Sequence, residues 1–180
     1  MMSNKNNKLS VFISLILRHK PQTIGIELDE FGYAKVDELI KGINNSGRKI
    51  TFDDLKSIVD EDQKGRYSFN EPMTLIRANQ GHSLNVKVPL RKMTPPPYLY
   101  HGTAKKSFNS IMDKGIKKMN RLYVHLSDNV QTATQVGKRH GEPVILKVAS
   151  QKMYEDGHRF YLSENNVWLV DYVPSEYIKV

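Results

Sequence analysis

Cysteine is absent from the 180 residues of this chain, which excludes disulfides, thiolate nucleophiles and cysteine-ligated zinc. No apolar run approaches the length needed to cross a membrane. The polar start, residues 1–8, is not followed by the hydrophobic core of a signal peptide. Internal repeats and low-complexity tracts are lacking as well. These absences predict a soluble, cytoplasmic protein without a membrane partner.

Carboxylates are too few to balance the cations. The 27 lysines and arginines against 19 aspartates and glutamates give a formal net charge of +8, and the excess is shared evenly between residues 1–93 and 94–180. Such a balance favours a polyanionic partner. Apolar residues make up 39% of the chain, which is enough for one ordinary core or two small ones.

Three consecutive prolines mark a boundary. Residues 94–97, Thr-Pro-Pro-Pro, form a stiff spacer with few backbone donors. We therefore predict an N-terminal domain over residues 1–93, a linker over 94–97 and a C-terminal domain over 98–180.

The most informative stretch of the first half is an arginine followed by a histidine. An apolar helix over residues 11–17 leads into Arg18 and His19, and Pro21 prevents it from continuing. A guanidinium beside an imidazole is a ready phosphate receptor. The alternative is that both side chains complement the helix macrodipole and cap its last carbonyls.

Two more helices and a hairpin complete this half. Asp37 is predicted to cap the second helix, and Thr51, with Asp54 three residues later, the third. We interpret the acidic group at 60–62 as a solvated helix end rather than a metal site. Strands are predicted over 66–69 and 74–78. Three helices followed by a hairpin is the order of a winged helix.

Further polar groups follow on and after the hairpin. Arg66 is predicted to project from its first strand, either as an ordinary exposed arginine or as a phosphate ligand. The segment 79–83 is a polar turn that supplies an imidazole and a hydroxyl, His82 and Ser83.

The second half is expected to be rich in strands. Residues 98–101 are predicted as a strand, with Gly102 as a tight exit and Thr103 as the cap of the next helix. This corner would offer free amides to an anion beside His101.

A second polar face lies further along. Alternation over residues 121–126 places Arg121, Tyr123 and His125 on one face of a strand, which is either a functional face or a solvated one. Ser127 and Asp128 are predicted to cap the helix after it. Arg139, near the end of that helix, matches the helix dipole or contacts phosphate. Trp168 is predicted to belong to the core.

Taken together, these motifs resemble the RNA 2′-phosphotransferase family of the KptA type. The resemblance spans nearly the whole chain, and the motifs occur in the family's order: Leu17-Arg18-His19-Lys20-Pro21, Gly65-Arg66-Tyr67, residues 76–83, Tyr100-His101-Gly102-Thr103, residues 121–127 and Asn166-Val167-Trp168-Leu169. Tyr123 is a departure, because many members have histidine there.

The resemblance implies an α+β protein with an N-terminal winged-helix lobe and a C-terminal lobe of the ADP-ribosyltransferase fold that binds NAD. It implies that the 2′-phosphate of an RNA attacks the nicotinamide ribose of NAD and expels nicotinamide. Transesterification then releases 2′-hydroxyl RNA and ADP-ribose 1″,2″-cyclic phosphate. In eukaryotes, transfer RNA splicing supplies such phosphates.

The matching motifs also imply a role for individual residues. The essential residues on the phosphate would be Arg18, His19, Arg66 and Arg121. NAD would be consumed as a co-substrate, without a metal, in a monomer, and further contacts to RNA or phosphate are expected from Arg77, His82, Ser83 and Arg139. The NAD site would comprise His101, Gly102, Thr103, Tyr123, His125 and Ser127.

Two alternatives stay open. The chain could be a non-catalytic winged-helix nucleic-acid binder, which leaves the second half unexplained. It could also be an ADP-ribosyltransferase that acts on another acceptor, such as a terminal phosphate of a nucleic acid or a protein.

Overall fold

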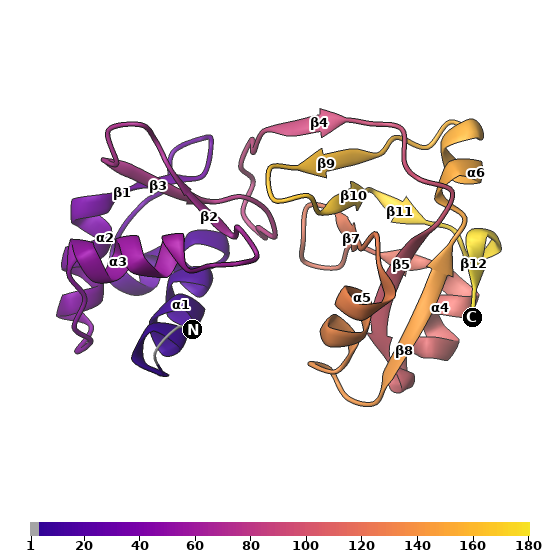
Figure 1. Cartoon of the computed structure of the whole chain (residues 1–180), viewed down its shortest axis with the longest axis horizontal. Coiled ribbons are helices and arrows are strands. Elements are labelled where there is room, and N and C mark those ends of the chain that lie inside the picture. Colours follow the sequence, from indigo (N-terminus) through magenta and orange to yellow (C-terminus); the bar gives the residue numbers. More distant parts are fainter. Residues whose placement is uncertain (1–3) are drawn as a thin grey trace. The chain divides into compact units, whose positions relative to one another are not determined.

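The computed structural model describes residues 4–180. They form two compact units, one up to Pro89 and one from Leu90 to Val180. Helices are mixed with small antiparallel sheets in an α+β arrangement (Figure 1), as predicted. No helix in this part of the chain is both long enough and apolar enough to span a membrane.

The first unit combines helices with one three-stranded sheet. In this sheet the strand order is β1-β3-β2 and both pairs are antiparallel. The elements are α1 (Asn4–Arg18), the 3-10 helix η1 (Pro21–Ile24), β1 (Tyr33–Lys35), α2 (Val36–Asn45), α3 (Phe52–Asp60), β2 (Tyr67–Phe69) and β3 (Leu75–Ala78). The three α-helices gather beside the sheet in Figure 1.

The core of this unit follows from the helical spacing of apolar residues. Ile13, Ile16 and Leu17 of α1 are fully buried, as are Leu39 of α2 and Leu55 of α3. Burying each such side chain stabilises the fold by about 1.5–3 kcal/mol. The apolar face of α1 thereby fixes the direction in which the helix ends.

The ends of these helices test the predicted caps. Helix α1 ends at Arg18, as predicted, although it begins earlier, at Asn4. Thr51 and Asp54 form a complete capping box on α3, also as predicted. The cap assigned to Asp37 is wrong: α2 begins at Val36, directly after β1, and the Asp37 carboxylate accepts instead from the Glu38 backbone N–H.

The second unit contains three small sheets, with strand orders β4-β9-β10-β7, β11-β6 and β12-β8-β5. Its strands are β4 (Leu90–Lys92), β5 (Leu99–Ala104), β6 (Ile116–Lys117), β7 (Val124–Leu126), β8 (Pro143–Val148), β9 (Tyr161–Ser163), β10 (Trp168–Val170), β11 (Tyr172–Val173) and β12 (Ile178–Lys179). Its helices are α4 (Phe108–Lys114), α5 (Val130–Gly137) and α6 (Ser150–Glu155), with the 3-10 turns η2 (Lys105–Ser107) and η3 (Ser175–Tyr177). Trp168 is buried in its core, as predicted.

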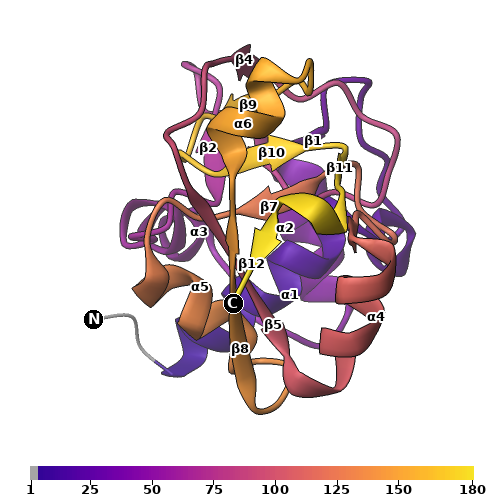
Figure 2. The ribbon, with the colours of Figure 1, turned by 90° about the vertical axis from the view of Figure 1, so that its right-hand side faces the viewer.

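Strand β5 runs further than predicted because β8 pairs with it along its whole length, and a helix packs against its glycine. The strand pairs with β8 as far as Ala104, so Thr103 is a buried strand residue and caps no helix. A Cβ at Gly102 would lie 1.7 Å from the carbonyl oxygen of Ala133 in α5. Glycine therefore permits α5 to lie against β5 and β8, an arrangement visible in Figures 1 and 2. The predicted anion-binding corner at Thr103 is wrong.

Strand β7 is shorter than predicted. It begins at Val124, so Arg121 and Tyr123 precede it in a bend. The cap of α5 is Asn129, whose side chain accepts from the Thr132 N–H at 2.8 Å, and the prediction of Ser127 and Asp128 is wrong.

Candidate active site

The end of α1 is tied to the segment that follows β3. The backbone N–H of Ser83 donates to the carbonyl of Arg18 at 3.0 Å, and the Ser83 hydroxyl lies 3.0 Å from Nδ1 of His19. The position that a Cβ would take at Gly81 lies 3.5 Å from Cδ, Nε and Cζ of Arg18. Arg18 and His19 are thus placed by a rigid helix end, a glycine and a hydroxyl.

Two other predicted residues lie deeper in this unit. Arg77 of β3 is buried, and its guanidinium carbon lies 4.7 Å from the ring centroid of Tyr33. His82 is 1% exposed, and neither of its ring nitrogens has a hydrogen-bond partner among residues 4–180. Burial, reinforced by the charges of Arg18, His19 and Arg77, lowers the pKa of His82 to about 4. The imidazole is therefore neutral at pH 7.

This neutral histidine predicts a pH dependence of stability. Between pH 6.5 and about pH 4, His82 is protonated in the unfolded chain but neutral in the folded chain, because folding lowers its pKa. Stability should therefore fall as the pH drops from 6.5 to 4, by about 3 kcal/mol in total. The measurement is hydrogen exchange of core amides in the first unit, in wild type and in His82→Leu. The variant should lose most of this slope, and identical slopes would contradict the assignment.

Arg66 immediately precedes β2 and is held by Asp62. Its Nε and Nη2 donate to Oδ1 of Asp62 at 3.0 and 2.8 Å, and its backbone N–H donates to Oδ2 at 2.6 Å. The Asp62 side chain is only 2% exposed, whereas that of Arg66 is 28% exposed. The prediction of a solvated acidic end was wrong for Asp62, because the guanidinium compensates its burial.

In the second unit a chain of hydrogen bonds links three predicted residues. Arg121 donates from Nη1 to Nδ1 of His125 at 3.0 Å. Arginine has no acceptor, so Nδ1 of His125 accepts and its proton resides on Nε2. The carbonyl of His125 accepts in turn from Nδ1 of His101 at 3.1 Å. Neutral His101 therefore presents Nε2 as an acceptor.

The surroundings of His101 keep it neutral. Burial lowers its pKa, the hydrogen bond to the His125 carbonyl opposes that shift, and the charges of Arg121 and His140 add to it. Desolvation, followed by the charge of Arg139, also lowers the pKa of Arg121. The charged groups of Arg121, Arg139 and His140 are therefore close enough to shift the pKa of a neighbour in this unit.

The remaining predicted residues of this unit lie around the same strands. Backbone hydrogen bonds at 2.8 Å join Ser127 to Tyr100, the residue before His101. The rings of Tyr123 and Tyr161 are tilted, with their centroids 5.6 Å apart. The backbone of Gly102 packs directly against α5. Arg139 is exposed, two residues beyond the end of α5.

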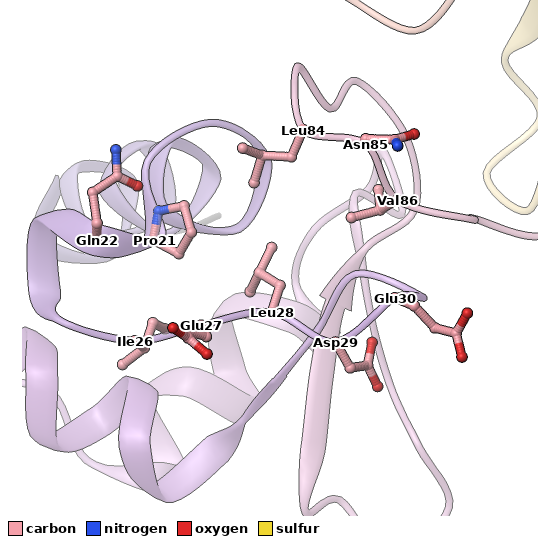
Figure 3. Close-up of a pocket in the computed structure, with 10 residues that line it drawn as sticks. All are labelled: Pro21, Gln22, Ile26, Glu27, Leu28, Asp29, Glu30, Leu84, Asn85 and Val86. Atoms are coloured by element: carbon pink, nitrogen blue, oxygen red, sulfur yellow. The ribbon is translucent and has the colours of Figure 1, made fainter.

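A groove of the first unit has a different character. Figure 3 shows its walls, which carry carboxylates and apolar side chains but no cation. Its volume is about 430 Å³, and it is lined by Pro21, Gln22, Ile26, Glu27, Leu28, Asp29, Glu30, Leu84, Asn85 and Val86. Negative charge disfavours a phosphate there, so the Arg18–His19 end of α1 is the better phosphate candidate.

Some residues of these clusters were not identified from the sequence. Asp62 was assigned to solvent, although its spacing of four residues from Arg66 was a usable signal. Tyr161 and His140 carry no local pattern that pairs them with Tyr123 and His101. Within residues 4–180, no group of three or more histidine, aspartate or glutamate side chains is arranged to hold a metal ion.

An α+β chain whose two units each place arginine beside histidine is suited to binding anionic groups. Residues 4–172 match the family described as "RNA 2'-phosphotransferase, Tpt1 / KptA family". The chain therefore belongs to this family, as its motifs predicted.

Proteins that carry the name "Probable RNA 2'-phosphotransferase" are similar over almost their whole length. The protein of Fusobacterium nucleatum is 54% identical over 173 residues, covering 96% of this chain and 97% of the relative. That of Flavobacterium johnsoniae is 49% identical, covering 99% and 98%. That of Nostoc punctiforme is 46% identical, covering 99% of both.

Proposed function

We propose that this protein is an enzyme that removes a 2′-phosphate from RNA by transferring it to NAD. The observation that carries the proposal is the near full-length similarity to relatives named for 2′-phosphotransfer. The proposed substrate is a tRNA-like RNA with an internal 2′-phosphate. We further propose a cytoplasmic monomer that uses no metal.

The first unit is proposed to be a winged-helix lobe that binds the RNA phosphate. Its three helices and antiparallel hairpin support that assignment. Arg18, His19 and Arg66 are proposed as phosphate ligands because arginine offers a planar fork of donors and because their positions are fixed by neighbouring groups. Arg77, His82 and Ser83 are proposed to support them. The neutrality of buried His82 favours a supporting role over a charged contact.

The second unit is proposed to be an ADP-ribosyltransferase-like lobe that binds NAD. Its donor set suits a dinucleotide: Arg121 and Arg139 match a diphosphate, and neutral His101 can accept from a ribose hydroxyl. Tyr123, paired with Tyr161, offers an aromatic face to a planar ring. Gly102, Thr103, His125 and Ser127 shape the strands on which these groups stand.

The proposed chemistry has two steps. A phosphate monoester is largely dianionic near neutral pH, so its oxygen attacks C1″ of the nicotinamide ribose without a general base, and nicotinamide leaves with the bonding electrons. The 2″-hydroxyl then attacks phosphorus and loses its proton, and the 2′-oxygen of the RNA leaves and takes up a proton, which yields the 2′-hydroxyl. The guanidinium groups of Arg18, Arg66 and Arg121, together with protonated His19, are proposed to stabilise the charge that builds on phosphorus.

Product analysis tests the proposal. The protein is incubated with NAD and a short RNA that carries one internal 2′-phosphate, and the products are identified by mass spectrometry. We expect 2′-hydroxyl RNA, nicotinamide and a cyclic phosphate of ADP-ribose in equal amounts. A stable ADP-ribosyl adduct as the only product would favour transfer to another acceptor. Binding of RNA without release of nicotinamide would favour a non-catalytic binder.

A further inference from the structure

Asp62 makes more contacts to Arg66 than a charge partner needs. Its Oδ1 accepts from Nε and Nη2 of the guanidinium at 3.0 and 2.8 Å, and its Oδ2 accepts from the Arg66 backbone N–H at 2.6 Å. Oδ2 also lies 3.2 Å from Nε. One carboxylate therefore fixes both the backbone and the guanidinium of the same residue.

The backbone on both sides of Arg66 is fixed as well. The Gly65 N–H donates to the carbonyl of Asp62 at 2.8 Å, and Gly65 adopts a positive φ of 53°. Asn79, which follows β3, donates to the carbonyl of Arg66 from its backbone N–H at 2.9 Å and to that of Gly65 from its side chain at 2.8 Å. The guanidinium is thus attached to a backbone that is itself held from two sides.

The hydrogen bonds to Asp62 use one edge of the Arg66 guanidinium and leave its other N–H donors available. Nε and Nη2 carry the bonds to Asp62, while Nη1 makes no hydrogen bond to any residue that the structure describes. Arginine has five N–H donors in one plane, so fixing one edge also fixes the direction of the others. More than a quarter of the side chain stays accessible.

A stabilising role alone does not account for this pair. Transferring a carboxylate into the interior is costly, and a buried ion pair is often no more stabilising than apolar residues of the same size. A carboxylate near a phosphate ligand also weakens the attraction for a dianion. What it supplies is a guanidinium that does not need to reorganise during the reaction.

We propose that Asp62 is a positioning residue that aims the Nη1 side of Arg66 at the reacting phosphoryl group. This inference rests on the proposed function. Asp62 touches neither RNA nor NAD and acts only through Arg66. Its contribution should therefore appear in the rate of phosphoryl transfer rather than in RNA affinity.

The first test is Asp62→Asn, which keeps the size of the side chain and removes its charge and one acceptor. Single-turnover rates with 2′-phosphorylated RNA and NAD should fall by about 10- to 100-fold, by analogy with the loss of a hydrogen-bond partner that orients a metal ligand. The Kd for the RNA should change by less than about threefold, because removing the carboxylate loosens the guanidinium but also removes the negative charge that offsets it. Glu38→Gln removes the exposed ion pair with Lys35 in the same unit and should leave the rate unchanged.

The decisive test is a double-mutant cycle. If Asp62 acts only through Arg66, adding Asp62→Asn to Arg66→Ala should lower the rate no further. A structural role that does not act through the Arg66 side chain, such as the bond from Asp62 to the Arg66 backbone N–H, predicts an equal loss in both backgrounds, which would overturn the proposal. The cycle is measured only after the wild type has been shown to release nicotinamide and the cyclic phosphate. A wild type that releases neither would refute the proposed function, whereas the cycle tests the role of Asp62.

A measurement on the wild type covers the case in which Asp62→Asn does not fold. The Nε–H signal of Arg66 in a 15N NMR spectrum should be resolved and slow to exchange, because that proton is bonded to a buried carboxylate. Rapid exchange with water would show that the guanidinium is not held and would refute the inference without any variant. In a folded Asp62→Glu variant, which retains the charge but shifts the carboxylate, the rate should also fall while RNA affinity stays within threefold.

Discussion

Replacing Arg18 by alanine is expected to reduce the single-turnover rate of phosphate transfer by about 10²-fold or more. The guanidinium stands at the end of a helix whose core face is fully buried, against Gly81 and beside the bond from Ser83 to the Arg18 carbonyl. Little conformational entropy is therefore lost when it binds a phosphate. Arg18→Lys should restore little activity, because an ammonium cannot form the same planar fork.

The matched control for Arg18 is Arg48 in the same unit. Its guanidinium carbon lies 3.7 Å from the ring centroid of Phe12, and no role in phosphate transfer is assigned to it. Arg48→Ala should leave the transfer rate within about twofold of wild type. Equal rates for the Arg18 and Arg48 variants would remove Arg18 from the proposed mechanism. Thermal unfolding of each variant separates loss of activity from loss of fold.

The second large effect is expected from Gly102→Ala. A methyl group at this position would lie 1.7 Å from the carbonyl oxygen of Ala133 and 2.9 Å from the backbone nitrogen of Gly137. Backbone atoms cannot yield as a flexible side chain can, so α5 must separate from β5. The expected loss in the free energy of unfolding is about 3 kcal/mol or more.

Urea unfolding monitored by tryptophan fluorescence measures this loss. Trp168 is the only tryptophan of the chain and lies in the core of the same unit, so its emission reports on that unit. The control is Gly157→Ala, where a Cβ meets nothing within 4 Å but φ is +99°. That variant should lose only about 1–2 kcal/mol, the cost of the backbone conformation. Equal losses would mean that the close approach of α5 is not what requires glycine at residue 102.

Local signals in the sequence predicted local structure well. The end of α1 at Arg18 and the capping box of Thr51 depend on residues within a few positions, and both were confirmed. Trp168 lies in the core, as predicted. The family followed from several weak motifs in a fixed order.

The wrong predictions share a physical cause. Thr103 is a good helix cap by type, but strand β5 continues through it because β8 pairs along its whole length. Asp62 was predicted to be solvated, whereas it is buried against Arg66, a partner that its spacing of four residues could have indicated. The burial of His82, which the sequence did not predict, likewise depends on neighbours from other elements. Packing partners decide such positions, and a single sequence does not name them.

The pairing of β4 with β9 determines where the chain can be cut. Leu90 lies opposite Ser163 and Lys92 opposite Tyr161, so β4 covers one edge of the sheet that carries Trp168 and the strand of His125. A fragment that starts after the prolines, at Tyr98, would expose the backbone donors and acceptors of β9 along that edge. Open edges of this kind recruit strands from other molecules. Truncation at Leu90 keeps the edge closed, whereas truncation at the prolines invites aggregation.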